Sequence, residues 1–461
     1  MLRFPQGFVW GAATSSYQIE GGWLEGGKGM SVWDAFVHTP GKIVNGDMGD
    51  VAADHFHRFR EDVALMAQMG LKAYRFSISW PRIQPTGRGE ANPDGIRFYS
   101  VLIDALLENG ITPWATLHHW DMPITLQLEC DGWLNPEMAV YFKEYAEICF
   151  EQFGDRVKHW ITLNEPWVTA ILGYGQGHFA PGRVSQTEPY IAAHNMLRAH
   201  GLTVDAFRRK FHDRCGGIIG IANNCDWREP LTDSEQDKQA AQRALEFFLG
   251  WFADPIYTGE YPAVMRERVR ERLPVFSDAD RAVIKGSADY FGLNHYNTMY
   301  TAHAEKGKIS HIDMESNAGL VDDQELALTD DDSWPKTDMG WNVAPWGCRK
   351  LLEWIDRRYD HPDIFLTENG CAAKDELING QINDQDRIDF LAGYLRECHN
   401  AMKNGVQLKG YFVWSFMDNF EWALGYTKRF GLHYVDYRTG ERIPKKSAQW
   451  YHGVIKNNGI F

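Results

Sequence analysis

Short apolar runs rich in β-forming residues recur eight times along the chain, and segments with helical periodicity separate them. The runs are FVWGAATSS (8–16), AYRFSISW (73–80), TPWATLHHW (112–120), HWITLNEP (159–166), GIIGIANN (217–224), DYFGLNHY (289–296), IFLTENG (364–370) and GYFVWSFMD (410–418). Helical periodicity marks 56–70, 95–110 and 135–154, and each segment ends in glycine, a common helix C-cap. Strands that are apolar on both faces and alternate with helices indicate a parallel sheet covered by helices. Eight such units close naturally into a barrel.

The chain length is compatible with one large barrel. For 461 residues, a prior of ~150 residues per domain suggests about three domains, but α/β barrels often run well past ~250 residues as one unit. The sequence contains no internal repeat, low-complexity tract or linker. We therefore predict an α/β fold, a single (β/α)8 TIM barrel over residues 1–461. The length beyond ~250 residues is expected in long βα-loop insertions, of which the polar stretch 301–335 is the clearest.

The charge and apolar patterns exclude several classes of partner. The net charge is −15 and no cluster of Lys or Arg stands out, which argues against nucleic acid and anionic membranes. No run of ~18 apolar residues is present, so we expect no transmembrane helix. Because the sequence enters a strand-like segment almost at once, we expect no signal peptide.

The seven cysteines indicate a reducing compartment. Their number is odd and none forms a CxxC pair, so we expect reduced thiols in a cytoplasmic protein. This pattern favours neither a disulfide framework nor a zinc site, and we expect no metal and no cofactor.

The chain contains 18 Trp, which is a high number. Most are expected in the core, and the exceptions are candidates for stacking against sugar rings.

The ends of the eight predicted strands are polar or aromatic. They carry Gln18, Arg75, His119, Trp120, Asn164, Glu165, Asn224, Asn294, Tyr296, Glu368, Asn369 and Trp414. In a barrel of this kind the chemistry lies at the carboxyl ends of the strands. Polar residues are common at strand ends, but enrichment at all eight predicts a functional site there.

Two glutamates end the fourth and seventh predicted strands, in HWITLNEPW and IFLTENG. A carboxylate at the end of an apolar strand must be solvated, be paired with a hydrogen-bond donor or a cation, or take part in catalysis. In an eight-stranded barrel Glu165 and Glu368 face one another. Either one alone could cap backbone or pair with an arginine, but two opposed carboxylates are the apparatus of glycoside hydrolysis. A separation of ~5–5.5 Å indicates retention of configuration and ~6.5–9.5 Å indicates inversion, and the sequence leaves this choice open.

Five motifs carry a resemblance to a known family. FVWGAATSSYQIEGG, HHWDMP, TLNEP, TENG and WSFMDNFEW occur in that order. Over essentially its whole length the chain resembles glycoside hydrolase family 1, the β-glucosidase family. The resemblance implies a retaining β-glucosidase that hydrolyses terminal non-reducing β-D-glucosyl residues of aryl and alkyl glucosides and of oligosaccharides by double displacement. It also implies substrates such as cellobiose and a place in cellulose degradation.

The resemblance assigns roles to matching positions. Glu165 is expected to be the acid/base and Glu368 the nucleophile, with Arg75 and Tyr296 contacting the nucleophile and Asn294 supporting the catalytic pair. The residues expected around the sugar are Gln18, His119, Asn164, Trp414, Glu421 and Trp422, with Tyr296 beside them; those of the outer subsite are Trp120, Trp167 and Leu172. Adjacent strand residues face opposite sides, so only one of His118 and His119 enters the site.

Three alternative functions would require other residues at some of these positions. A 6-phospho-β-glycosidase is expected to have a Ser and a Lys in the last loop, where this chain has Glu421 and Trp422. A thioglucosidase is expected to lack Glu165, and a non-catalytic sugar-binding relative to lack one of the two glutamates. Glu421 accepts hydrogen bonds from either orientation of the 4-hydroxyl, which predicts secondary β-galactosidase or β-fucosidase activity. Trp167 and Leu172 predict weak inhibition by glucose.

Three further motifs are judged structural. GWLEGGKG (22–29) nearly matches a phosphate-binding loop, but Gly29 stands where a Ser or Thr is needed. His55 and His57 are two residues apart on a predicted helix and do not share a face. The acidic residues near 329–332 are expected in a solvated loop because no Asp ladder with calcium-binding spacing follows.

Overall fold

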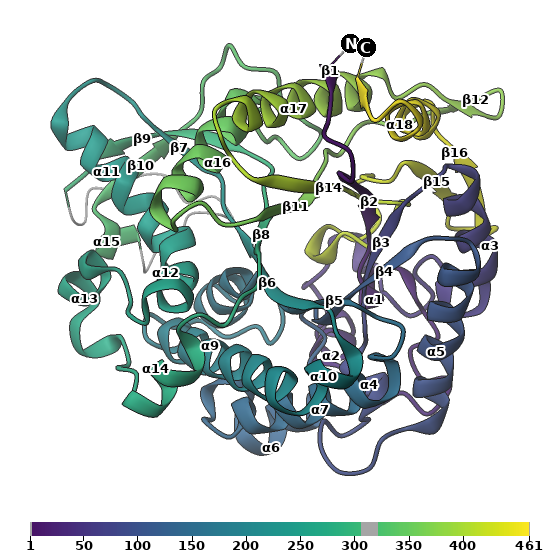
Figure 1. Cartoon of the computed structure of the whole chain (residues 1–461), viewed down its shortest axis with the longest axis horizontal. Coiled ribbons are helices and arrows are strands. Elements are labelled where there is room, and N and C mark those ends of the chain that lie inside the picture. Colours follow the sequence, from purple (N-terminus) through teal and green to yellow (C-terminus); the bar gives the residue numbers. More distant parts are fainter. Residues whose placement is uncertain (1, 306–320, 461) are drawn as a thin grey trace.

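The computed structural model describes residues 2–305 and 321–460, and in it the eight predicted strands close into a parallel barrel (Figure 1). The barrel strands are β2 (Val9–Ala13), β3 (Ala73–Ser77), β4 (Thr112–His118), β5 (His159–Asn164), β6 (Ile218–Asn224), β8 (Phe291–Asn294), β11 (Ile364–Asn369) and β14 (Leu408–Trp414). They follow one another in chain order around the barrel, and β14 pairs with β2 to close it. The predicted TIM barrel is confirmed.

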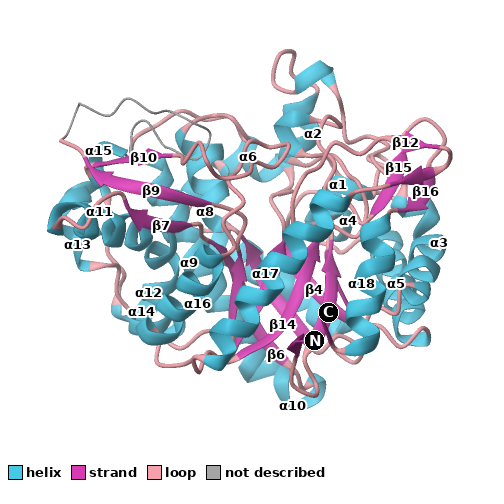
Figure 2. Ribbon diagram, turned by 90° about the horizontal axis from the view of Figure 1, so that it is seen from above, coloured by secondary structure: helices cyan, strands magenta, loops and turns pink. Residues whose placement is uncertain are grey.

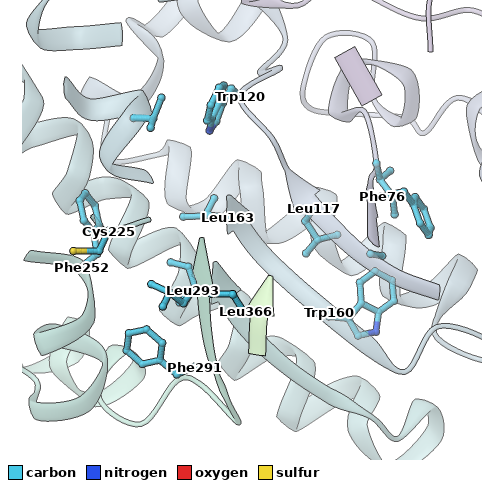
Figure 3. Close-up of a cluster of buried hydrophobic side chains, with 14 of the residues drawn as sticks. Phe76, Leu117, Trp120, Trp160, Leu163, Cys225, Phe252, Phe291, Leu293 and Leu366 are labelled. Carbon is cyan, nitrogen blue, oxygen red and sulfur yellow. The ribbon is translucent and has the colours of Figure 1, made fainter. Parts of the chain in front are cut away.

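Side chains alternate between the two faces of the strands and form two separate cores. Ala13, Trp114, Ile161, Phe365 and Phe412 belong to one cluster with their counterparts on other strands, and this cluster fills the barrel interior. Their direct neighbours belong to a much larger cluster between the strands and the helices. Figure 3 shows part of that outer cluster, with Leu117, Leu163, Leu293 and Leu366 from four strands. Burial on both faces explains why the strands read as continuous apolar runs.

Helices surround the barrel (Figures 1 and 2). They are α1 (Ser16–Ile19), α2 (Val32–Val37), α3 (His55–Gln68), α4 (Trp80–Ile83), α5 (Pro93–Glu108), α6 (Ile124–Cys130), α7 (Met138–Phe153), α8 (Pro166–Val168), α9 (Glu188–Ala206), α10 (His212–Cys215), α11 (Glu235–Leu245), α12 (Trp251–Thr258), α13 (Ala263–Val269), α14 (Asp278–Ile284), α15 (Val321–Gln324), α16 (Trp346–Arg358), α17 (Gln385–Lys403) and α18 (Lys446–Asn457).

The three helices predicted from periodicity are confirmed as α3, α5 and α7. Pro93 occupies the first turn of α5, and the Asn92 side chain accepts a hydrogen bond from the Asp94 amide, so the sequence starts the helix where an N-cap is available. Gly70 and Gly110 follow α3 and α5 with φ of 75° and 69°, the left-handed conformation that ends helices most easily at glycine.

Short strands lie outside the barrel. They are β1 (Leu2–Arg3), β7 (Trp227–Pro230), β9 (Thr298–His303), β10 (Leu326–Thr329), β12 (Leu377–Ile378), β13 (Gln381–Ile382), β15 (His433–Asp436), β16 (Glu441–Pro444) and β17 (Gly459–Ile460). β1 pairs with β17, which brings the two chain ends together (Figure 1).

The insertion predicted at 301–335 falls partly outside the described residues. Its described part is more ordered than a polar loop, because β10 pairs antiparallel with β9, and β9 pairs with β7. Met299, Leu326 and Leu328 of this small sheet pack against α11 residues. The pairing partners lie far apart in sequence, which is why composition alone indicated a loop.

None of the helices that the structure describes combines the length and apolar character needed to cross a membrane.

Candidate active site

A pocket with a volume of about 150 Å3 lies at the carboxyl ends of the barrel strands. Its lining includes most of the residues predicted for the site: His119, Trp120, Glu165, Trp167, Leu172, Asn294, Tyr296, Glu368, Trp414, Glu421 and Trp422. The remaining predicted residues, Gln18, Arg75 and Asn164, are buried but are not part of the lining. The structure therefore gathers residues from across the whole chain at one end of the barrel.

Glu368 is held by two donors. Arg75 Nη1 donates to Oε1 over 2.6 Å, and the Tyr296 hydroxyl donates to Oε2 over 2.7 Å. Burial raises the pKa of Glu368, while the Arg75 guanidinium and the Tyr296 hydroxyl oppose that rise. Both contacts favour the ionised carboxylate.

Glu165 lies in a different environment. Its described hydrogen bond comes from the Asn294 side-chain amide, 2.7 Å from Oε1. Burial, followed by the charge of Glu368, raises the pKa of Glu165 well above its usual value. The neutral carboxylic acid is therefore favoured at Glu165 to a higher pH than at Glu368.

Arg75 links the two sides of the pocket. Its Nη1 also donates to the Thr367 carbonyl, its Nη2 donates to Asn164 Oδ1 over 2.6 Å, and its Nε donates to Thr116 Oγ1. Each guanidinium nitrogen is thus used, and the side chain is held in one orientation. Sequence analysis assigned no role to Thr116 or Thr367. Thr116 lies outside the five motifs, and Thr367 belongs to TENG but contacts Arg75 through its backbone carbonyl.

A second network joins the two asparagines. Asn294 Nδ2 contacts Asn164 Oδ1 as well as Glu165, and its own Oδ1 accepts from the Thr367 hydroxyl over 2.7 Å. The Asn164 amide also lies 3.0 Å from His119 Nε2. This network fixes the position of Glu165 relative to Arg75.

Irregular pairing precedes both glutamates. The register of β5 shifts between Ile161 and Asn164, and that of β11 shifts between Leu366 and Glu368. Such irregularities re-aim side chains near the ends of strands. Strict alternation therefore does not predict which side chains enter the pocket at these two ends.

Three lining residues adopt left-handed backbone conformations. Glu165, Trp120 and Trp422 have φ of 44°, 77° and 49°. For non-glycine residues this conformation costs on the order of 1–3 kcal/mol, and it persists only where surrounding contacts enforce it. Trp120, for example, donates its indole N–H to the Asn164 carbonyl over 2.8 Å.

Aromatic rings form one side of the pocket. The ring centroids of Trp120 and Trp422 are 4.5 Å apart, and His119 lies nearly parallel to both Trp414 and Trp422. His118 instead packs outward against Trp133, which confirms that only one histidine of the pair enters the site.

Glu421 contributes an unpartnered acceptor to the pocket. Its Oε2 is buried and has no hydrogen-bond partner among the residues that the structure describes. Burial and the charge of Glu368 raise the pKa of Glu421 to about 8. The group is therefore ready to exchange a hydrogen bond with a polar ligand.

Gln18 makes its hydrogen bonds within the protein. Its Nε2 donates to Asn419 Oδ1 and to the Phe420 carbonyl, and its Oε1 accepts from the Ser15 hydroxyl. The side chain thus holds the segment that leads to Glu421. A direct contact between Gln18 and a sugar stays a prediction.

The outer part of the pocket is mainly apolar. Trp167 packs on Phe248 with ring centroids 4.4 Å apart, and Leu172 lies in the π-helical segment Thr169–Gly175. Asn224, one of the predicted strand ends, also lines the pocket. Further lining residues to which no role was assigned are Val168, Phe179, Asp226, Phe248, Met339, Trp341, Ala423, Leu424 and Phe430. None of these further residues lies in a barrel strand, so no strand pattern marks them.

The motifs judged structural make local contacts. His55 Nδ1 lies 2.7 Å from Asp62 Oδ2, and the Lys28 ammonium contacts Asp34 and two backbone carbonyls. Among the residues described, no group of three or more His, Cys, Asp and Glu side chains is arranged to hold a metal ion.

Comparisons with known proteins agree over the whole length of the chain. Residues 1–460 match the family described as glycosyl hydrolase family 1. Beta-glucosidase A from Thermotoga maritima is 47% identical and is matched over 99% of each chain; beta-glucosidase 4 from rice is 47% identical over 99% of this chain and 95% of its own. The solved T. maritima family 1 β-glucosidase superposes with a TM-score of 0.93 at 46% identity, covering both chains completely. The chain therefore belongs to glycosyl hydrolase family 1.

Proposed function

We propose that the chain is a retaining β-glucosidase that removes terminal non-reducing β-D-glucosyl residues by double displacement. The observation that carries this proposal is the asymmetry of the two buried glutamates. Glu368 receives a guanidinium and a phenol hydroxyl on its two oxygens, whereas Glu165 receives a neutral amide and the repulsion of Glu368. A nucleophile must be ionised and a general acid must carry a proton, and these environments favour that division of roles.

In the proposed reaction Glu368 attacks the anomeric carbon while Glu165 gives its proton to the leaving oxygen. The product of this step is a glycosyl ester on Glu368 and a free aglycone alcohol. In the second step Glu165, now ionised, takes a proton from water as the water attacks the ester. Glucose leaves with its original β-configuration, and both glutamates return to their starting states.

We propose aryl glucosides, alkyl glucosides and oligosaccharides such as cellobiose as substrates. One relative, 48% identical over the full length of both chains, is named 1,4-beta-D-glucan glucohydrolase from Thermotoga neapolitana. The T. maritima β-glucosidase has also been solved in complex with deoxynojirimycin. A role in cellulose degradation follows from this substrate class.

Glycone selection is assigned to Glu421. Its unpartnered oxygen supports binding of a glucose hydroxyl and also tolerates the other orientation of the 4-hydroxyl, so we propose secondary β-galactosidase or β-fucosidase activity. A 6-phospho-sugar is disfavoured because the lining described for the pocket includes Glu421 and no Lys or Arg.

All seven cysteines are free thiols, which supports a cytoplasmic location.

The proposal is tested by following hydrolysis of an aryl β-glucoside by NMR. β-Glucose is expected as the first product, and α-glucose would contradict retention.

Glu368→Ala is expected to abolish turnover, with partial rescue by azide as a small nucleophile. Glu165→Gln is expected to slow substrates with poor leaving groups far more than activated aryl glucosides, because the latter need little protonation. Equal losses for both substrate types would contradict the acid role.

A further inference from the structure

His295 lies between the two residues that donate to the paired glutamates. Asn294, the last residue of β8, donates to Glu165 Oε1 over 2.7 Å. Tyr296 donates to Glu368 Oε2, also over 2.7 Å. The backbone at His295 joins these two donors directly, so a displacement of that backbone moves both of them.

The His295 side chain points away from the pocket. Successive side chains of an extended segment alternate between its two faces. Leu293 and Cys225 belong to the cluster outside the barrel strands (Figure 3), whereas Tyr296 packs against the cluster inside the barrel. His295 is fully buried, and its ring centroid lies 5.8 Å from that of Tyr394 on α17. The imidazole is therefore separated from the sugar pocket and acts only through its neighbours.

Hydrogen bonds connect His295 to the ends of two neighbouring strands. Its imidazole Nδ1 lies 2.9 Å from the carbonyl oxygen of Cys225, which directly follows β6. The Cys225 amide in turn donates to the Asn294 carbonyl over 3.0 Å. On the other side, the His295 amide donates to the Glu368 carbonyl over 3.1 Å, and the Asn369 side chain donates to the His295 carbonyl over 2.6 Å. This one residue thus joins β6, β8 and β11.

The contact with Cys225 fixes the tautomer of the imidazole. A carbonyl oxygen can only accept, so Nδ1 carries the proton. Burial is the main cause that lowers the pKa of His295; the Asp226 charge and the Cys225 carbonyl oppose it, and the Arg228 charge lowers the pKa further. The net direction is downward, so the imidazole is neutral near pH 7 and keeps the same donor.

We propose that His295 is a positioning residue: its Nδ1 hydrogen bond to the Cys225 carbonyl fixes the end of β8 and thereby aims both donor side chains at the two glutamates. This inference rests on the proposed function, because that function gives the two glutamates their roles as acid/base and nucleophile.

The proposed role predicts a distinct change in the pH profile of kcat/KM. This profile rises as Glu368 ionises and falls as Glu165 loses its proton. The Asn294 amide lowers the pKa of Glu165, and the Tyr296 hydroxyl lowers that of Glu368. Displacement of both donors raises both pKa values, so the acidic and the basic limb both move to higher pH. Loss of the Tyr296 hydroxyl alone moves only the acidic limb.

The test compares two variants of similar shape. Leu and Asn side chains have nearly the same size, but only Asn carries an N–H close to the position of the imidazole Nδ1. His295→Leu is expected to lower kcat/KM on an aryl β-glucoside about tenfold and to move each limb up by about 0.5 pH unit or more. His295→Asn is expected to return both limbs to within about 0.2 pH unit of the wild type. Equal shifts in the two variants, or unmoved limbs in His295→Leu, would overturn the proposal.

The matched control is His433→Leu. His433 is 2% exposed, and its Nδ1 lies 3.0 Å from the Phe416 carbonyl oxygen. The variant therefore loses a buried bond of the same kind without removing a contact of Asn294 or Tyr296. It is expected to lose thermal stability while both limbs stay in place. Limbs that move equally in this control would assign the effect to general destabilisation and would also overturn the proposal.

A neutron crystal structure of the wild-type chain tests the contact without any variant, so the proposal stays testable if the variants do not fold. A deuteron on His295 Nδ1 directed at the Cys225 carbonyl supports the proposal, and a deuteron on Nε2 alone overturns it. If the wild-type protein hydrolyses no β-glucoside, the proposed function fails, while the neutron structure still decides the His295 contact. The two failures are therefore distinguishable.

Discussion

Single residues decide the protonation of the catalytic pair. Arg75 and Tyr296 oppose the effect of burial on the pKa of Glu368, whereas the pKa of Glu165 is lowered by the neutral Asn294 amide and by the Arg75 charge, without a direct bond from a cation among the described residues. Activity is expected to rise with pH as Glu368 ionises and to fall as Glu165 loses its proton. The profile is therefore bell-shaped, and its two limbs belong to the coupled pair.

The phenol of Tyr296 sets the acidic limb of that profile. Its hydroxyl donates to Glu368 Oε2 and stabilises the ionised form. In Tyr296→Phe the pKa of Glu368 rises, so the acidic limb of kcat/KM is expected to move up by about one pH unit. The control Tyr290→Phe loses a hydroxyl bonded to the Trp160 carbonyl and is expected to keep both limbs in place. An acidic limb that does not move in Tyr296→Phe would rule out this contact as its cause.

At the scale of elements, the segment after β5 shapes the outer pocket. Trp167 and Leu172 line the pocket and offer few hydrogen bonds to free glucose, which loses water there without replacement partners. We expect weak product inhibition in the wild type and stronger inhibition in Trp167→Ser and Leu172→Ser, measured as the inhibition constant for glucose. Leu128→Ser, at a 78% exposed site on α6, is the control. Equal inhibition in all variants would mean that Trp167 and Leu172 serve only packing, as the contact between Trp167 and Phe248 also allows.

The loop after β14 is held by a buried ionic network. The Lys445 ammonium at the start of α18 contacts Asp375 and Asp418, and Arg429 contacts Asp418 from the far end of the loop that carries Glu421. Arg387 pairs with Asp375 and Asp384, so three cations balance three carboxylates.

Removing one cation leaves this network unbalanced. Lys445→Met is expected to lower the free energy of unfolding by about 3–5 kcal/mol, because Asp375 and Asp418 each lose one of two cations and one buried negative charge is left uncompensated. Lys446→Met is the neighbouring control. In the described part of the chain the exposed Lys446 ammonium donates to the Gln385 side chain, so the variant should change stability by less than ~0.5 kcal/mol. Urea unfolding measures both. Similar losses in the two variants would show that the network does not stabilise the loop.

At the scale of the whole molecule, the cysteines test the predicted reduced state. All seven are free, and Cys130 is half-buried while the others are buried. A thiol reagent is expected to label at most Cys130 in the native protein and all seven thiols after unfolding in guanidinium without reductant. Two fewer thiols in the unfolded sample would reveal a disulfide.

Much of the molecule could be predicted from the sequence. The eight strands were visible because burial on both faces makes each a continuous apolar run, as in IFLTENG. The helices α3, α5 and α7 were visible from their period and their glycine ends. Glu165 and Glu368 stood out because a carboxylate at the end of such an apolar run needs a hydrogen-bond or ion-pair partner or has a catalytic role.

Tertiary structure alone decides which side chains meet, and how. The register shifts before Glu165 and Glu368, the left-handed backbone at Trp120 and Trp422, and the contacts of Arg75 with Thr116 and Thr367 leave no local signal. Each arises between strands or loops that are distant in sequence, and their conformations are enforced by surrounding contacts. Local propensity and periodicity report only on neighbours along the chain, so they locate the two glutamates but not the environment that distinguishes their pKa values.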